Sequence, residues 1–597
     1  IVPILSNWMI KADKYQYHHG ALHAHAGQAL DPAEVKQVNK HLKEELKEPG
    51  KNDFFERIKI GYMNVLQKNM PRKKWILPLY FIIAVGLAAA CFLSIGKDMM
   101  PKINNGQFQV RIKEPDGTRL ERTEDKVRQV LKIIDTTVNH NVSISSTYVG
   151  LIPSSYGSSN LYIFNTGTHE AVIQVNLNRD YHVNTDELKE ALRKNISHSL
   201  PGLRISFEPI DLTEKIMSQG ASTPIEVRVA GKDIKEIEDY AHKVVTKFSA
   251  IPFLRDVQIA QPLKFPVVTI SIDRIKAAQL GLNVQDIAQS VTASTSSSRF
   301  TEKNQWLDET KAYTYQVQVQ VPEYVMNTMD ELREIPLVKG QSSPVLGDIA
   351  TFNTSYVPGE YDRSGPRRFL TVSANIHKKD LGAATTAIEH ALKDLDAPPK
   401  GMKVEIKGMS SLLIETLSSL QTGLLFAILV MFLLLAANYQ SFKLSLTVLS
   451  TVPAVIAGSL ILLLATGSTL NLQSYMGMIM SAGVSVANAI LIVTNAESLR
   501  LNYRDATKAS VMSASIRLRP ILMTSFAMIA GMVPMALGMG EAGEQSAPLG
   551  RAVIGGLAAS TLAALFILPH VFAWTQRKAK LHTVSLLPDE NEKELSN

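Results

Sequence analysis

The sequence is poor in cysteine and nearly free of charge in its most apolar stretches. Cys91 is its only cysteine and lies inside such a stretch, which excludes a disulfide framework. The apolar cores between Ser419 and Trp574 contain no Asp, Glu, Lys or Arg, and Glu415 and Arg551 lie at the ends of these stretches. No nucleophile–base pair and no metal-ligand spacing stands out, so an enzyme is the least favoured class.

Six long apolar stretches dominate what is present. The chain has 597 residues, of which 46% are hydrophobic, typical of a protein that combines membrane and water-exposed parts. Each stretch is close to the roughly 20 residues that a helix needs to cross a bilayer core. We therefore predict six transmembrane helices, at 75–95, 419–437, 444–466, 474–495, 520–539 and 550–574.

The basic residues flank these stretches on one side of the predicted membrane. The formal net charge is +7, and Lys and Arg gather at 72–74, 500–519 and 577–580. The loops that follow the third and fifth stretches contain neither residue. By the positive-inside bias the basic ends are cytoplasmic, and 96–418 lies on the far side of the membrane. The positive charge thus reflects topology and does not indicate nucleic-acid binding.

The two ends of the chain differ from its middle. Residues 1–10 are apolar but lack a signal-peptide pattern, so we interpret them as the end of a truncated transmembrane helix in a longer protein. Residues 11–51 are polar and His-rich, which favours a cytoplasmic loop, with a metal site as the weaker alternative. Residues 575–597 are predicted to be a cytoplasmic tail.

A short amphipathic helix is predicted at 52–70, directly before the first span. Its apolar residues recur at helical spacing and should share one face, as in helices that lie in the membrane interface. These residues are Phe55, Ile58, Tyr62, Val65 and Leu66.

The region 96–410 contains a repeat of strand and helix patterns. A β-α-β-β-α-β order is predicted at 107–220, and the same order at 222–262 continued by 366–409. Such split βαβ units fold as ferredoxin-like antiparallel sheets with helices on one face. Residues 263–365 form an insertion within the second unit. The predicted fold class is therefore an α+β membrane protein, with a helix bundle, two ferredoxin-like subdomains and an inserted lobe.

A polar stripe marks the fourth predicted span. Ser481, Ser485, Asn488 and Asn495 follow at spacings of four, three and seven, which places them on one helical face. Because polar side chains are costly in hydrocarbon, this face should meet other helices or a hydrated path. Close packing of small and polar residues between helices is the alternative.

Two motifs carry a resemblance to a known family. GVSVANAILIV at 483–493 and IRLRPILMTS at 516–525 resemble the tenth and eleventh transmembrane helices of resistance-nodulation-division (RND) efflux pumps. FLSIGKDMMPKINNGQFQVRI, from residue 92, also resembles this family. The resemblance covers 52–577 and implies the C-terminal half of such a pump. It also implies that the two repeated units are porter subdomains and that 263–365 is a docking insertion.

The resemblance implies a proton relay in the helix pair. Its members here would be Ser485, Asn488, Arg517 and Thr524. The family's relay lysine would fall at Ala487, so that cation is missing, and the titrating aspartates would belong to the absent N-terminal half. Arg517 has an alternative reading as a positive-inside anchor at the cytoplasmic end of a helix.

Two substrate classes compete within the family. The stretch 147–164 resembles the switch loop and aromatic pocket of drug exporters, in which Tyr148, Ile152, Tyr156 and Phe164 would line a pocket for amphiphilic small molecules. Ordinary sheet core is the alternative for each of these residues. A heavy-metal exporter would need several methionine ligands, and Met217, with Met99 and Met100 near the membrane, is an incomplete set.

As a whole, the resemblance implies a proton antiporter of the bacterial inner membrane with no cofactor beyond the proton gradient. Its partners would be a periplasmic adaptor protein, an outer-membrane channel and two further copies in a homotrimer. Three alternatives stay open: a heavy-metal exporter, a protein-translocation accessory, and a truncated, non-transporting assembly subunit.

Overall fold

The computed structural model describes residues 54–577, apart from 102–103, 105, 152–162, 182, 219, 303, 323, 339–340 and 541–542. The predictions for 1–10 and 11–51, and for the tail beyond Arg577, lie outside the described residues. The chain divides into two compact units. A helical unit contains the residues up to 105, 376–390 and those from 408 onward, and a sheet unit contains 106–375 and 391–407.

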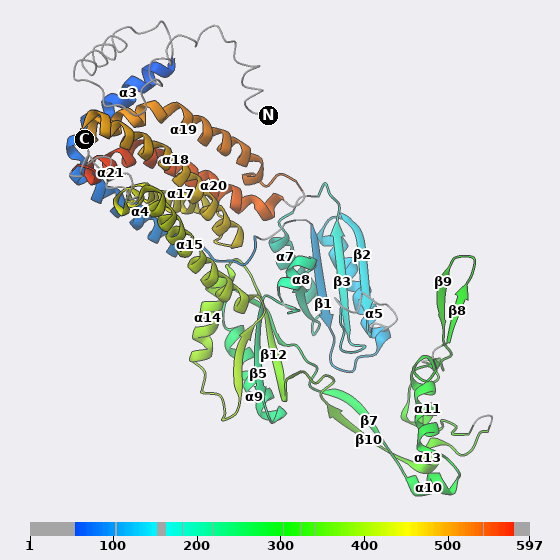
Figure 1. Ribbon diagram of the computed structural model, residues 1–597. Helices are drawn as coiled ribbons and strands as arrows, with labels where there is room; N and C mark the ends of the chain where they lie inside the picture. Colours follow the sequence, from blue (N-terminus) through cyan, green and yellow to red (C-terminus); the bar gives the residue numbers. More distant parts are fainter. Residues whose placement is uncertain are drawn as a thin grey trace. The chain divides into compact units, whose positions relative to one another are not determined.

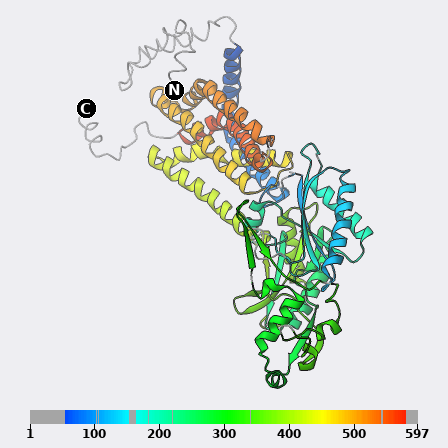
Figure 2. The same ribbon diagram turned by 90° about the vertical axis from the view of Figure 1, so that its right-hand side faces the viewer.

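The helical unit has six helical segments that are long and apolar enough to cross a membrane, within the part of the chain that the structure describes. They run alongside one another in both views (Figures 1 and 2). The helices are α4 (Lys73–Ser94), α15 (Met409–Tyr439), α16 (Phe442–Leu449), α17 (Val452–Ala465), α18 (Leu472–Tyr503), α19 (Ala506–Ala536), α20 (Gly543–Leu562) and α21 (Leu568–Thr575).

Helices α15 and α18 extend beyond the predicted spans 419–437 and 474–495, and three further segments differ in other ways. The stretch predicted as one helix at 444–466 is divided between α16 and α17, where Pro453 occupies the first turn of α17. The helix predicted at 520–539 begins at Ala506, so Pro520 lies inside it. The stretch 550–574 contains a π-helical turn, Ala563–Ile567, between α20 and α21. Hydropathy finds the apolar part of a helix but not its polar ends or its irregular turns.

Helices α17 and α20 pack with their backbones close together. A Cβ atom placed on Gly458 of α17 would lie 2.3 Å from the Cβ of Ala559 and 2.5 Å from the carbonyl oxygen of Gly555. A Cβ on Gly555 would lie 2.4 Å from the carbonyl oxygen of Gly458. Such close approach is typical of membrane helices that meet at small residues.

Helix α3 (Phe54–Asn69) is present where the sequence predicts an amphipathic helix. Tyr62 and Leu66 are 7% and 1% exposed and join the core of the helical unit, and Phe55 packs against that core. Ile58 and Val65 are exposed. The position of α3 in a membrane interface stays a prediction.

The first sheet of the sheet unit is antiparallel, with strand order β2-β3-β1-β4. Its elements follow the predicted β-α-β-β-α-β order: β1 (Gln107–Lys113), α5 (Leu120–Thr137), β2 (Val142–Val149), β3 (Glu170–Leu177), α7 (Thr185–Ser199) and β4 (Arg204–Glu208). Alternate residues of β1, such as Val110 and Ile112, pack with Val130 of α5 and Leu192 of α7 in one hydrophobic core.

The second sheet repeats this order, with β6-β12-β5-β13 corresponding to β2-β3-β1-β4. Two-residue β11 (Arg363–Ser364) adds to its edge. The elements are β5 (Ile225–Gly231), α9 (Ile234–Ser249), β6 (Leu254–Ile259), β12 (Arg367–Ile376), α14 (Leu381–Lys393) and β13 (Lys403–Lys407). The internal repeat inferred from the sequence is thus present as a repeat of strand order.

The insertion begins and ends in a two-stranded antiparallel ribbon (Figure 1), formed by β7 (Phe265–Ile272) and β10 (Ala350–Val357). Beyond it lie α10 (Arg274–Gln279), α11 (Val284–Thr295), α12 (Met329–Arg333) and α13 (Leu346–Ile349), with a hairpin of β8 (Asn304–Asp308) and β9 (Tyr313–Val317). Ile287, Ile335 and Leu346 form part of a separate hydrophobic core.

Candidate functional site

The polar stripe of α18 faces other helices of the unit. Ser481, Ser485 and Asn488 are buried, and Asn495 is half-buried. The Ser485 hydroxyl donates to Oγ1 of Thr451, at the start of α17, over 3.1 Å. Ser481 uses its hydroxyl within its own helix, where it donates to the Met478 carbonyl over 3.0 Å. The stripe is therefore part of the interior of the bundle.

Hydroxyl groups of the neighbouring helices extend this stripe. Asn495 donates through Nδ2 to Oγ of Ser513 on α19 over 3.2 Å, and Ser513 donates to the Ile492 carbonyl over 2.7 Å. Thr561 of α20 donates to Oγ of Ser525 on α19 over 2.7 Å. We call these hydroxyl and amide contacts, together with Ser485–Thr451, the polar seam. A hydroxyl both donates and accepts a hydrogen bond, so these contacts satisfy polar groups inside an otherwise apolar bundle.

The predicted relay residues do not lie on one surface. Ser485 and Asn488 point into the bundle, whereas Thr524 and Ala487 are exposed on the outer sides of α19 and α18. The Thr524 hydroxyl donates within its own helix, to the Ile521 carbonyl over 3.0 Å. Arg517 is half-buried, and its Nε is buried without a hydrogen-bond partner among the described residues. The structure thus separates an inner pair, Ser485 and Asn488, from an outer pair, Thr524 and Ala487.

Sequence reasoning missed the partners of the stripe. Thr451, Ser513, Ser525 and Thr561 are buried, and each contacts a polar group of another helix. Their only signal in the sequence is a hydroxyl side chain in a mostly apolar stretch, which also occurs where the hydroxyl bonds to its own backbone. The contacts between helices could not be predicted without the packing of the bundle.

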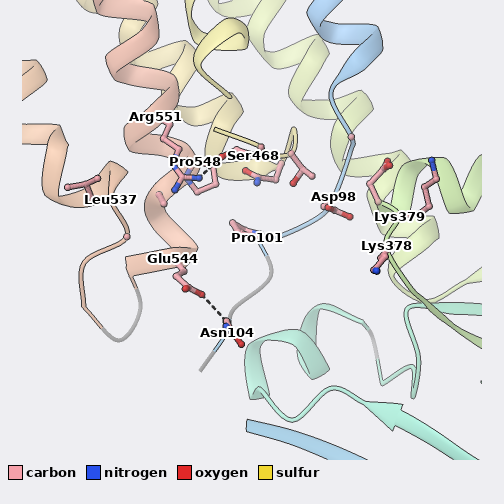
Figure 3. A pocket seen from close by; sticks show the side chains of 17 residues that line it. Asp98, Pro101, Asn104, Lys378, Lys379, Ser468, Leu537, Glu544, Pro548 and Arg551 are labelled. Carbon is pink, nitrogen blue, oxygen red and sulfur yellow. Dashed lines mark hydrogen bonds between the residues drawn. The ribbon is translucent and has the colours of Figure 1, made fainter. Parts of the chain in front are cut away.

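A cavity of about 730 Å³ opens at the end of the bundle opposite the basic loops (Figure 3). Arg551 of α20 lies on its wall, where it donates to Oγ of Ser468 over 2.6 Å and to the Ala536 carbonyl over 2.9 Å. Glu544 accepts a hydrogen bond from the backbone of Asn104 over 2.8 Å. Arg551 thus ties the loop after α17 to the end of α19.

In the sheet unit, the face of β1 opposite the helices carries a buried polar network. Gln109, Arg111 and Lys113 alternate with the core residues of β1. Arg111 Nε lies 2.5 Å from Oε1 of Glu208 on β4, and Arg111 NH1 lies 3.2 Å from Oε2 of Glu170 on β3. Lys113 Nζ lies 2.6 Å from Oε1 of Glu170. We call this group the sheet ion network.

The network shifts the titration of its carboxylates. Burial alone would raise the pKa of Glu170, but the attraction of Lys113 and Arg111 outweighs it and lowers the pKa to about 2. For Glu360, which lies outside this network, burial and repulsion from Asp362 outweigh the attraction of the same cations and raise its pKa to about 7. One carboxylate is therefore held ionised, and the other exchanges a proton near neutral pH.

Two of the four predicted pocket residues can be placed. Phe164 is 62% exposed, and its carbonyl accepts a hydrogen bond from Arg111 over 2.8 Å. Tyr148 is half-buried, and its carbonyl accepts from Nδ2 of Asn165 over 3.2 Å. Ile152 and Tyr156 lie outside the described residues. The Phe164 ring thus lies exposed beside the sheet ion network.

The methionines proposed as metal ligands have different surroundings. Met99 is 5% exposed in the helical unit, Met100 is half-buried, and Met217 is half-buried at the end of α8 (Leu212–Met217) in the sheet unit. Among the described residues, no group of three or more His, Cys, Asp or Glu side chains is arranged to hold a metal ion.

The fold and these motifs define a membrane transporter of one family. The model of the AcrB/AcrD/AcrF family matches residues 29–576, and the chain belongs to this family of RND transporters. The resemblance inferred from the helix motifs is thereby confirmed.

Relatives of two kinds match almost the whole chain. The cobalt-zinc-cadmium resistance protein CzcA of Cupriavidus metallidurans is 26% identical over 530 residues, which cover 87% of this chain and 48% of the relative. The multidrug resistance protein MdtC of Erwinia tasmaniensis is 25% identical over 526 residues, covering 87% and 49%. The chain thus spans about half the length of the curated relatives it matches.

The fold is also that of a solved transporter. A crystal structure of a heavy metal efflux pump aligns with a TM-score of 0.72 at 23% identity, covering 88% of this chain and 53% of that one. This similarity supports the fold of the chain and does not distinguish its substrate.

Proposed function

We propose that this chain is the C-terminal part of an RND transporter that exports amphiphilic compounds across the bacterial inner membrane in exchange for protons. The observation that carries the proposal is the polar seam, in which buried hydroxyls and amides of α17, α18, α19 and α20 contact one another in an apolar bundle. Because hydroxyls and amides do not titrate near neutral pH, the acids that take up the proton would belong to residues beyond this chain.

The separation of inner and outer residues suggests two roles. Ser485 and Asn488 would keep the bundle polar inside and allow α18 to shift against α17. Thr524 and Ala487, on the outer sides of α19 and α18, would face an acidic helix of the other half. Arg517, whose Nε has no hydrogen-bond partner among the described residues, would supply the positive charge that the missing lysine does not.

The substrate class follows from the exposed surface beside the sheet ion network. The Phe164 ring offers an apolar surface, and the adjoining polar groups offer hydrogen bonds, as a surface for varied amphiphiles requires. Tyr148, Ile152 and Tyr156 would complete this pocket. The strand order of the two sheets supports their assignment as ferredoxin-like porter subdomains, and the insertion would be the docking lobe.

Partners and location are part of the same proposal. RND transporters generally act as trimers together with adaptor and outer-membrane channel proteins. We infer a homotrimer with a periplasmic adaptor and an outer-membrane channel, with the sheet unit on the periplasmic side.

Heavy-metal export is the second candidate. It is favoured by the similarity to CzcA, whose name states cobalt, zinc and cadmium resistance. An assembly subunit without transport activity is the third candidate, because the relay lysine position holds Ala487.

Dye accumulation in cells tests the proposed function. The full-length protein should lower accumulation of an amphiphilic dye, and Ser485→Ala or Asn488→Ala should raise it again, whereas Gly483→Ala, at a site with no atom within 4 Å of the added methyl group, should not. Phe164→Ala should change which dyes are exported. Tolerance to cobalt, zinc and cadmium without dye export would favour the metal exporter, and neither activity would favour the assembly subunit.

A further inference from the structure

His570 is a buried ionisable side chain in the last helix of the bundle. It is 3% exposed and lies in α21, three residues after the π-helical turn Ala563–Ile567. The apolar cores of the predicted spans contain no Asp, Glu, Lys or Arg, but His570 is ionisable and stands in the last of them. An ionisable group inside a membrane segment is costly to bury and commonly marks a proton path. Histidine is also the side chain whose ordinary titration lies nearest to neutral pH.

The hydrogen bonds of the ring define which nitrogen is available. Nδ1 of His570 lies 2.6 Å from the Phe566 carbonyl oxygen. A carbonyl only accepts, so Nδ1 carries the hydrogen, and Nε2 of the neutral ring is an unprotonated acceptor. Nε2 is buried and has no hydrogen-bond partner among the described residues. No other hydrogen-bond donor among the described residues therefore occupies Nε2, and this nitrogen can accept a proton.

An acceptor for that proton lies at the end of α3. The backbone of Asn69, the last residue of α3, is close enough to the His570 ring to act on it as a hydrogen-bonding group. A protonated ring can donate from both nitrogens, to the carbonyls of Phe566 and Asn69. The charged form would thus link α3 to α21 by a bond that the neutral form does not make.

Helix α3 is fixed to the same turn by a second contact. The Tyr62 hydroxyl donates to the Leu565 carbonyl over 2.6 Å, and its ring meets Phe566 edge-on with 5.5 Å between centroids. Leu565 and Phe566 both belong to the π-helical turn. Such turns are rare, widen the helix locally and often occur at functional sites. The turn exposes one carbonyl to Tyr62 and places the next against His570.

The helices that pack against α21 carry several charged groups. On α4, Lys73 Nζ donates over 3.3 Å to the carbonyl of Ala573, three residues after His570. Lys443 of α16 is exposed. On α19, Arg519 lies over the Phe55 ring and Arg517 is half-buried; on α18, Arg500 pairs with Glu497 over 2.6 Å.

Asp505, at the start of α19, accepts hydrogen bonds from the backbone N–H groups of Thr507 and Lys508.

We propose that His570 is a proton-binding group at the basic end of the bundle, which takes up and releases one proton through Nε2 during transport. The inference rests on the proposed proton-driven function. The proton is exchanged with water on the side of the basic loops, and no covalent bond changes. Protonation adds the bond to Asn69 and tightens α3 against α21, and release loosens it.

A titration of the purified full-length protein tests the site without any need for transport. The chain has 14 histidines, so the His570 signal is identified as the imidazole ¹⁵N resonance that His570→Asn removes. Asparagine keeps an amide donor for the Phe566 carbonyl but does not titrate. We expect the signal to titrate between about pH 5 and 8. Tyr62→Phe, which keeps the ring contact and loses the bond to Leu565, should shift the midpoint. A His570 signal that does not change with pH overturns the proposal.

Proton flux in proteoliposomes then tests the role in transport. The amphiphile gradient drives the flux, and the pH on the side of the basic loops is varied. We expect His570→Asn to reduce the flux at least about tenfold and to flatten its pH profile, with amphiphile binding unchanged. An unchanged profile in this variant overturns the proposal. A wild-type protein that titrates at His570 but shows no substrate-linked proton flux overturns the proposed function instead.

Discussion

In the helical unit the buried polar groups are mostly hydroxyls and amides, whereas the sheet unit also buries a network of ions. The polar seam contains contacts such as Ser525–Thr561, in which no charge is desolvated. The sheet ion network places Arg111 and Lys113 against Glu170 and Glu208, with most of their side-chain surface buried. A lipid-facing bundle cannot offer water to a charge, but a sheet can surround each ion with several partners. The two units therefore differ in what a single substitution should cost.

The largest expected effect is the loss of Arg111. Arg111→Ala removes the cation that pairs with buried Glu208 and one of the two cations that pair with buried Glu170, which should destabilise the sheet unit by about 3 kcal/mol. Thermal unfolding of the purified protein measures this loss. Arg119→Ala is the control, because Arg119 pairs with Glu121 only at the surface, where both side chains are more than half exposed. Equal melting temperatures for the two variants would contradict a network role for Arg111.

Gly458→Ala tests the packing of the helical unit. The added methyl group would lie 2.3 Å from the Cβ of Ala559, so α17 and α20 must separate, at a cost of about 2 kcal/mol. Gly483→Ala on α18 adds the same group where no atom lies within 4 Å and should stabilise the helix slightly. Unfolding in detergent measures both variants. A Gly458→Ala protein as stable as wild type would mean that the two helices are not packed this closely.

Local patterns in the sequence predict some features of the fold, whereas contacts between distant residues are not predicted. Strand order and the six apolar segments follow from local patterns, because alternation in β1 and continuous hydropathy in α15 are properties of neighbouring residues. The contact between Gly458 and Gly555 and the pair Arg111–Glu208 join residues about a hundred positions apart, and no local pattern carries them. The same holds for the candidate site: the stripe on α18 was visible, but the outward position of Thr524 was not.

His570 is a different case, because the sequence alone shows an ionisable residue in the apolar run ALFILPHVFAW. The orphaned Nε2 and the π-helical turn before it depend on the structure. The sequence thus contained the residue, and the structure supplied the reason to single it out.

The pH dependence of stability tests the role of a partly buried carboxylate, Glu360. Its pKa is raised to about 7 in the folded protein, above the ordinary value of 4.5 that it regains on unfolding. Between these values the folded protein holds a proton that the unfolded chain has released, so stability falls as the pH rises from about 4.5 to 7 and then levels off. Glu170, with a pKa near 2, acts oppositely and loses its contribution as the pH falls below 4.5.

Glu360→Gln should therefore stabilise the protein at pH 7.5 and leave it unchanged at about pH 4.5. Because Glu360 is only partly buried, solvent screening limits the gain to about 1 kcal/mol. Chemical unfolding at a series of pH values measures it, with Glu302→Gln, on an exposed carboxylate of the insertion, as the control. A gain that is the same at both pH values would show that the effect is not one of ionisation.

The smallest expected effect concerns a single hydroxyl pair of the seam. Thr561→Val keeps the shape of the side chain and removes its bond to Ser525, and hydrogen bonds between membrane helices contribute only about 0.6 kcal/mol on average. Thr422→Val is the matched control, because the Thr422 hydroxyl is exposed and bonds within its own helix, to Ser418. Unfolding in detergent should therefore separate the two variants only slightly. A loss of stability for Thr561→Val as large as that for Arg111→Ala would mean that the polar seam contains buried charge or trapped water. The helical unit would then not differ from the sheet unit in the kind of polar group it buries.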